Sequence, residues 1–256
     1  MTSSIKTHRE GGVLTLTLAR ADKKNALTNA MYGALADAID SASSGDIQVI
    51  LIEADGDTFT AGNDLGEFAA QGADSNEERH VARFLKNLAT TSVPVIAAVQ
   101  GKAVGVGTTM LLHCDFVVLA EDAQLITPFV NLALIPEAAS TYLLPLRVGY
   151  ARAFEMFAFG KPVLAADAMK WGLANKVVPK ESLGREAKQV ADEIAAKPAG
   201  SISAMKTLMR ESDKVLTQMR TESSIFSERL KSAEAREAFA AFAEKRKPDF
   251  AKVRSK

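Results

Sequence analysis

The sequence predicts a layered α/β protein that ends in a helical region, and three observations support this. Apolar runs of strand length, separated by small-residue loops and helical patterns, occur at residues 47–52, 93–99 and 116–120. From residue 201 onward the apolar positions recur only at helical spacing. The composition changes at Pro198-Ala199-Gly200. We therefore place a core at residues 1–198 and a helical C-terminal region at residues 199–256, which must pack on the core or on another subunit.

The elements of the core follow from their periodicity. Leucine alternates with threonine over residues 14–18, which predicts a half-buried strand. Over residues 27–39 apolar side chains recur every four positions and predict a helix that ends before Gly45. Comparable patterns predict further helices at 81–88, 108–113, 140–147, 152–159, 165–171 and 182–196, with a short extended segment at 174–179.

Composition excludes some classes of function. Of the 256 residues, 47% are apolar and 24% charged, and the net charge is zero, so nothing favours a nucleic-acid or membrane-surface partner. We also see no apolar run of the ~18 residues that a membrane span needs. Cys114 is the only cysteine, and the N-terminus carries no visible secretory signal. We therefore expect a cytoplasmic protein.

Two loops rich in small residues follow the first two apolar runs. They span residues 58–65 (TFTAGNDL) and 101–107 (GKAVGVG). Small residues let the backbone approach a ligand closely, so each loop can direct a main-chain N–H at a common point. Two N–H donors that converge on one oxygen form an oxyanion hole, which stabilises the charge that develops in reactions at a carbonyl. The loops therefore predict an enzyme that acts on a carbonyl compound.

Other readings of these motifs are weaker. A dinucleotide fingerprint requires a third glycine where Met110 stands, and no P-loop lysine follows the second loop. The adjacent His113, Cys114 and Asp115 match no zinc-site spacing, so we expect no metal site and interpret Cys114 as a buried structural residue. No histidine lies near Ser140 in sequence to activate it as a nucleophile.

Glu137 is the candidate general base. It is the single carboxylate between Leu125 and Leu146, and apolar surroundings raise the pKa of a carboxyl group toward neutrality. Because Glu137 follows Pro136, it is equally suited to cap the N-terminus of the next helix. Local sequence leaves both interpretations open.

Together these motifs resemble a known family. Asn25-Ala26-Leu27, residues 59–65, residues 99–107 leading to Cys114-Asp115, and residues 244–250 occur in the order and spacing of the enoyl-CoA hydratase/isomerase (crotonase) superfamily. The resemblance covers essentially the whole chain. It implies a crotonase-like spiral of ββα units with a C-terminal helical region that builds trimers, often as dimers of trimers. It also implies an acyl-CoA substrate, held as a thioester, and no separate cofactor.

The same resemblance assigns roles to residues. The two oxyanion donors would be the amides of Ala61 and Val106, although the family usually has glycine at the second position. Asp64 would lie near the adenine end of coenzyme A. Lys245 and Lys247 either contact its phosphates or remain solvated. The coenzyme A site would comprise Lys24, Ala26, Ala61, Gly62, Asn63, Asp64, Leu65 and Lys245.

One departure from the family pattern bears on the reaction. Family hydratases use two glutamates to activate water, and Thr109 and Phe129 occupy those positions here. The segment from residue 127 to residue 145 instead looks like the peroxisomal-type Δ3,Δ2-enoyl-CoA isomerase branch, whose single catalytic glutamate matches Glu137. This likeness favours Glu137 as a base over Glu137 as a cap.

We therefore expect an enoyl-CoA isomerase that shifts a double bond through a thioester enolate. Three alternatives remain open: a hydratase with atypical residues, another enolate chemistry such as decarboxylation or hydrolysis, and a catalytically silent acyl-CoA binding module. Residues 66–76 read as a surface loop that could also shape the acyl pocket.

Overall fold

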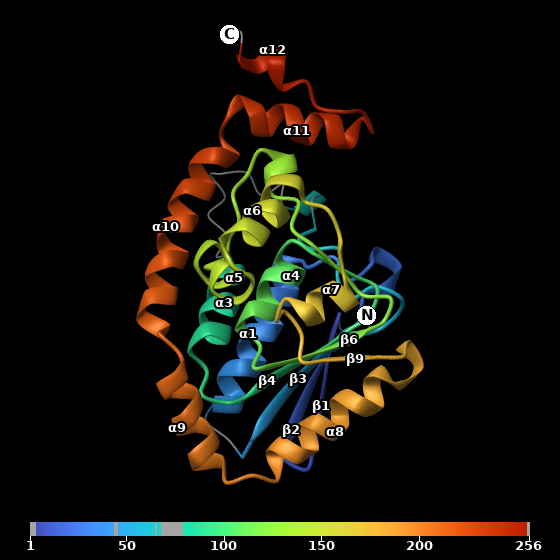
Figure 1. The fold of residues 1–256 in the computed structure, drawn as a ribbon, viewed down its shortest axis with the longest axis vertical. Coiled ribbons are helices and arrows are strands. Elements are labelled where there is room, and N and C mark those ends of the chain that lie inside the picture. Colours follow the sequence, from blue (N-terminus) through green and yellow to red (C-terminus); the bar gives the residue numbers. More distant parts are fainter. Residues whose placement is uncertain (1–3, 44–45, 65, 68–78, 255–256) are drawn as a thin grey trace.

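The computed structural model describes residues 4–43, 46–64, 66–67 and 79–254 (Figure 1). In these residues a six-stranded sheet has the order β1-β2-β3-β4-β6-β9. Only its β1–β2 pair is antiparallel, and the other neighbours are parallel. The strands are β1 (Ile5–Glu10), β2 (Val13–Leu18), β3 (Val49–Ala54), β4 (Val95–Val99), β6 (Phe116–Ala120) and β9 (Lys176–Val178). The predicted α/β class and the helical C-terminal region are confirmed.

Helices cover both faces of this sheet. Leu183, Ala187 and Ala191 of α8 (Leu183–Ala195) pack against one face in a single apolar cluster. The other face packs against α1 (Asn29–Ser43) and α3 (His80–Thr90), whose buried residues join the larger core cluster. In Figure 1, α8 lies across the strands at the lower right, while α1 and α3 lie between the strands and the C-terminal helices at the left. Burial on both faces explains why β3 and β4 are almost continuously apolar.

A second, three-stranded sheet has the order β5-β7-β8 and stands beside the first. Its strands are too short for a sequence pattern to reveal, and sequence analysis did not predict them. They are β5 (Lys102–Val104), β7 (Gln124–Ile126) and β8 (Val163–Leu164). β5 continues directly from β4 after Gly101, so the second small-residue loop crosses from one sheet to the other. The short helices α4 (Val106–Thr109) and η2 (Met110–His113) follow it.

The remaining helices lie in the second half of the chain, except for one short turn at Ala21–Lys23. The four whose ends were predicted, at 140–147, 152–159, 165–171 and 182–196, agree with the structure to within two residues at each end. The remaining helices are η1 (Ala21–Lys23), η3 (Val130–Leu132), α5 (Ser140–Val148), α6 (Tyr150–Phe159), α7 (Ala165–Lys170), η4 (Lys180–Ser182), α9 (Ala199–Met209), α10 (Ser212–Leu230), α11 (Ala233–Ala243) and α12 (Phe250–Arg254). A domain boundary at residue 198 stays a prediction, with α9 beginning at Ala199.

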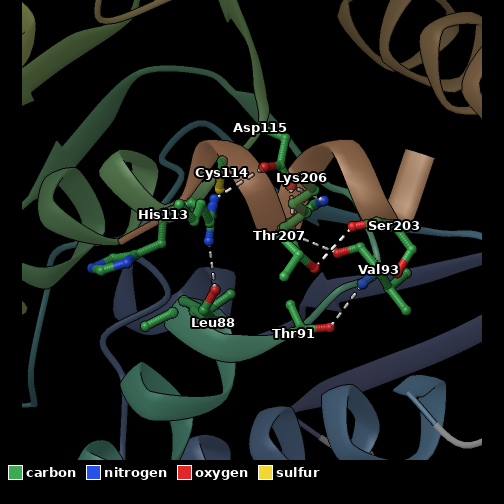
Figure 2. Close-up of polar contacts among 12 residues, drawn as sticks. Leu88, Thr91, Val93, His113, Cys114, Asp115, Ser203, Lys206 and Thr207 are labelled. Carbon is green, nitrogen blue, oxygen red and sulfur yellow. Dashed lines mark hydrogen bonds and ion pairs between the residues drawn. The ribbon is translucent and has the colours of Figure 1, made fainter. Parts of the chain in front are cut away.

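Buried charges attach the C-terminal helices to the core. Figure 2 shows the Lys206 side chain of α9 directed at Asp115, and its Nζ lies 2.7 Å from the Asp115 carboxylate and donates to the Val93 carbonyl at 2.6 Å. Arg210 donates to the same carboxylate at 3.0 Å and to the Leu88 carbonyl at 3.1 Å. Lys206 is only 5% exposed, so α9 and the start of α10 are tied closely to the sheet.

Candidate active site

Asn25 supports the first small-residue loop through hydrogen bonds. It is fully buried, its Nδ2 donates to the carbonyls of Asp55 and Thr58 at 2.8 Å, and its Oδ1 accepts from the Arg20 amide. Its own carbonyl accepts from the Thr60 hydroxyl at 2.6 Å. Asn25 therefore holds the first small-residue loop in place.

Backbone hydrogen bonds join the two small-residue loops. The Thr60 amide donates to the Lys102 carbonyl and the Val104 amide to the Thr60 carbonyl, both at 3.0 Å. Gly62 has φ +89°, and a side chain there would place Cβ 2.8 Å from the Val104 carbonyl oxygen. Only glycine permits this close approach. Because β3 and β4 are parallel neighbours, both loops leave the same edge of the sheet.

The loop amides differ in their availability. The Ala61 amide donates to the Lys24 carbonyl at 2.9 Å, so the predicted role of Ala61 as an oxyanion donor needs correcting. Within the described residues, the amides of Asn63 and Val106 donate no hydrogen bond. Val106 is 2% exposed, and buried amides without an acceptor are rare in folded proteins. Asn63 and Val106 therefore supply the amides that remain free for a ligand oxygen.

The surroundings of Glu137 suit a base. It is half-buried, and its Oε1 accepts a hydrogen bond from the Thr109 hydroxyl at 2.6 Å. Burial raises the pKa of Glu137 to about 7, the Thr109 hydrogen bond opposes that rise, and the charge of Glu222 adds to it. A carboxyl group with this pKa exchanges protons readily near neutrality.

Two cavities lie beside these residues and share part of their lining. The first has a volume of about 340 Å³ and is lined by Ala61, Asn63, residues 104–106, Phe129 and the apolar face of α11. The second, of about 580 Å³, is lined by Asn63, Glu137 and apolar side chains of α3 and α10. Asn63 and Phe226 line both cavities. A ligand that spans both cavities would therefore pass Asn63 and would have Glu137 in the wall of the second cavity.

Tyr32 was missed by sequence analysis. It is 4% exposed, its hydroxyl donates to the Asn63 Oδ1, and its ring packs against Phe84 at 5.6 Å between centroids. Burial and the charges of Glu137 and Glu67 raise the pKa of Tyr32 well above its usual value, so it keeps its proton. Tyr32 thus holds the Asn63 side chain beside the free Asn63 amide. Nothing in the local sequence distinguishes it from any other helix-face aromatic residue.

The residues predicted to bind coenzyme A differ in their exposure and in their hydrogen-bond and ion-pair partners. Lys24 is exposed and paired with Asp57 at 3.0 Å. The Asp64 carboxylate is occupied, since it accepts from Arg20 at 2.7 Å and from the amides of residues 66 and 67 at 3.1 Å. Lys245 is exposed at the end of α11, and it is the neighbouring Arg246 that lines the first cavity. The Ala26 carbonyl accepts from Arg20 at 2.9 Å. Leu65 lies outside the described residues.

His113 and Cys114 have structural roles. Burial raises the pKa of the Cys114 thiol to about 12, and Cys114 is 2% exposed, which makes it a poor nucleophile. Burial lowers the pKa of His113 to about 4, and its Nε2 lies 2.8 Å from the Ala138 carbonyl. In the described part of the chain, no three His, Cys, Asp or Glu side chains are grouped to hold a metal ion. No described helix is long and apolar enough to cross a membrane.

Comparison with known proteins identifies the class. Residues 8–253 match the family described as enoyl-CoA hydratase/isomerase. The chain is 33% identical to 1,2-epoxyphenylacetyl-CoA isomerase of Escherichia coli K12, over 98% of this chain and 99% of that protein. It is 34% identical to enoyl-CoA delta isomerase 2 of Rattus norvegicus over 80% of this chain, and the match spans about half (54%) of that longer protein.

The fold agrees with this match. A crystal structure of an enoyl-CoA hydratase/isomerase from Pseudoalteromonas atlantica T6c superposes with a TM-score of 0.93 at 40% identity, covering 97% of this chain and 100% of that one. This is the crotonase fold that the motifs led us to expect. The chain belongs to the enoyl-CoA hydratase/isomerase family of the crotonase superfamily and is an acyl-CoA-processing enzyme.

Proposed function

We propose that this enzyme is a Δ3,Δ2-enoyl-CoA isomerase. The observation that carries the proposal is that Glu137, with a pKa of about 7, is the one carboxylate among the described residues that line the second cavity. Thr109 stands where a hydratase of this family has a glutamate, so a second water-activating carboxylate is missing at this position. The Thr109 hydroxyl instead donates a hydrogen bond to Glu137. Isomerisation needs a single base, whereas hydration also needs a positioned water.

In the proposed reaction the thioester oxygen lies between the amides of Asn63 and Val106. Glu137 removes a proton from C2 of a 3-enoyl-CoA, and the electrons of that C–H bond form an enolate whose charge rests on the thioester oxygen. The protonated Glu137 then returns the proton to C4. The C3–C4 double bond is lost, and a conjugated C2–C3 double bond forms. The proton stays on one carboxyl group, so atoms and charge balance.

We further propose how the substrate lies. The acyl chain enters the second cavity beside Glu137, and the first cavity takes the part of coenzyme A next to the thioester. Lys24, Ala26, residues 61–64 and Lys245 remain our candidates for the rest of the coenzyme A site, with Asp64 acting through its loop. Coenzyme A arrives with the substrate, and the proposed proton transfer uses no separate cofactor. We also propose a cytoplasmic homotrimer or dimer of trimers, the assembly that the family resemblance implies.

The test uses 3-enoyl-CoA substrates and the absorbance of the conjugated product. The parent protein should form 2-enoyl-CoA, and Glu137→Gln should lower kcat at least about 10²-fold while acyl-CoA still binds, because only the base is lost. Hydration of crotonyl-CoA without isomerisation would point to the hydratase alternative. Binding without any turnover in the parent would point to a silent binding module.

A further inference from the structure

The turn that carries Glu137 has an unusual backbone. Ala138 and Ala139 both lie in the left-handed region, with φ of 62° and 55°. Alanine rarely adopts this conformation, because its Cβ crowds the neighbouring carbonyl oxygen. The Ser140 amide closes the turn by donating to the Glu137 carbonyl at 3.1 Å. The orientation of Glu137 thus depends on a turn that its own residues do not favour, so other parts of the molecule must hold it.

The peptide group between Ala138 and Ala139 is held on both sides. Its carbonyl accepts from His113 Nε2 at 2.8 Å, and its amide donates to Glu222 Oε2 at 2.6 Å. His113 comes from η2 and is 2% exposed. Glu222 comes from α10, 83 residues after Ala139, and is also 2% exposed. Two side chains from separate elements therefore fix the orientation of one peptide plane.

Glu222 makes further contacts with the same turn. Its Oε1 accepts from the Thr141 amide at 3.0 Å and from the Thr141 hydroxyl. The Thr141 hydroxyl in turn accepts from Gln218 Nε2 at 2.8 Å. Within the described residues Glu222 forms no ion pair with a cation. A buried carboxylate usually requires one, so the contacts that hold this charge in place are those with the Glu137 turn.

We propose that Glu222 is a positioning residue for Glu137, which clamps the Ala138–Ala139 peptide together with His113 and places a negative charge behind the base. No ligand contact is needed for this role, because Glu222 acts through the backbone of the turn. The inference deepens the proposed function, since it explains how a C-terminal helix controls the base. It rests on the proposed isomerase reaction only for its rate measurement.

Several polar groups surround Glu137, and their contributions differ. Thr109 of α4 donates a hydrogen bond, and Tyr32 of α1 is neutral. Arg79 just before α3, Lys86 of α3 and Arg220 of α10 line the same cavity. Glu222 is the charged group whose interaction raises the pKa of Glu137. Removal of its charge should therefore lower the pKa of Glu137, whereas displacement of the turn with the charge retained should not.

The test compares Glu222→Gln with Glu222→Asp. Glu222→Gln keeps the size of the side chain but removes the charge and one acceptor; Glu222→Asp keeps the charge but is too short to reach both amides. Both should lower kcat about tenfold or more with little change in KM, because the base is misplaced. In Glu222→Gln the acid limb of the pH–rate profile should also move to lower pH. In Glu222→Asp it should not.

An acid limb at the same pH in the two variants, or an unchanged kcat in both, would overturn the proposal. If Glu222→Gln does not fold, Glu222→Asp still tests the clamp through kcat and through hydrogen exchange at the Ala139 amide, which should become faster.

A substrate-free measurement separates this inference from the proposed reaction. The Glu137 carboxyl can be titrated by infrared difference spectroscopy, with Glu137→Gln as the blank. Glu222→Gln should lower its pKa whatever reaction the enzyme performs. An absence of isomerase turnover in the parent, with this titration shift present, would reject the isomerase and keep the clamp. Isomerase turnover in the parent, without this titration shift, would keep the isomerase and reject the clamp.

Discussion

Thr109 and Glu137 share the 2.6 Å hydrogen bond that sets the state of the base. The hydroxyl donates to the carboxylate and so favours its charged form, partly offsetting the rise in pKa that burial causes. Thr109 therefore orients Glu137 and keeps it ionisable near neutrality.

Thr109→Val should raise the pKa of Glu137 and shift the acid limb of the pH–rate profile to higher pH. We expect kcat at pH 7 to fall about tenfold, since a hydrogen bond to a charged group contributes about 1.5–3 kcal/mol, and to fall less at pH 9. Thr109→Ser keeps the hydroxyl and is the control. A limb that moves equally in both variants would argue against the hydrogen bond as the cause.

Glu137 also makes stability depend on pH. Its pKa is about 7 in the folded protein against an ordinary 4.5, so the folded state holds the proton more tightly than the unfolded state does. Stability is therefore lost as pH rises from about 4.5 to 7, and below 4.5 both states are protonated and the cost vanishes.

Glu137→Gln should accordingly be inactive yet more stable. At pH 8 its free energy of unfolding should exceed that of the parent by about 3 kcal/mol, and the difference should disappear near pH 4. Urea unfolding at several pH values measures this. A difference that is constant with pH would mean that ionisation of Glu137 is not its origin.

At the scale of single residues, sequence analysis named the candidate base and one free amide but assigned the other amide to Ala61. A small-residue loop shows that amides can approach a ligand, but not which of them already have acceptors. That depends on the Lys24 carbonyl, which lies 37 residues earlier in the chain. The same limit hid Tyr32 and Glu222, since their partners are remote in sequence.

At the scale of elements, the attachment of α9 and α10 to the core depends on Asp115. Its carboxylate accepts from Lys206, from Arg210 and from the Val95 amide at 2.8 Å, as Figure 2 shows in part. Burial lowers the pKa of Lys206, and the Asp115 charge opposes that shift. The pair therefore holds a cation that the interior would otherwise disfavour.

Asp115→Asn should lower the free energy of unfolding by about 3 kcal/mol, because it leaves the Lys206 charge buried without its partner. Lys206→Met should cost less, since it removes the buried cation while Asp115 keeps Arg210. Urea unfolding of the two variants at pH 7 provides the comparison. If Lys206→Met proved as costly as Asp115→Asn, the packing of the lysine stem rather than its charge would be responsible.

Elements with a long apolar stripe were predictable, and the three-residue strands β5 and β7 were not. Three residues contain too few positions to show a period of two. Their existence depends on the crossing of the chain at Gly101, where the backbone passes from one sheet to the other.

At the scale of the whole molecule, a large apolar surface is left uncovered. Leu208 and Met209 of α9 are 88% and 77% exposed, and Met209 and Leu146 line one groove of about 500 Å³ between α9 and α5. Exposed apolar surface of this kind is typical of contacts between protein chains. It supports the proposed self-association.

Light scattering after size exclusion should give the mass of three or six chains of 27.3 kDa. Met209→Asp, in the groove, should shift the protein to smaller species, because a charge in an apolar interface is costly to bury. Leu164→Asp, at a residue 54% exposed on β8 and outside the groove, is the control. A parent protein that is monomeric at micromolar concentration would contradict the proposal.

The sequence by itself determined the α/β class, the helical C-terminal region, the family resemblance and Glu137 as the candidate base. These follow from patterns that lie close together along the chain. Only the tertiary structure decided which amides remain free, that Thr109 bonds Glu137, and that Glu222 and His113 hold the turn behind it. Hydrogen-bond partners and pKa shifts arise between residues far apart in sequence, so no local pattern can specify them.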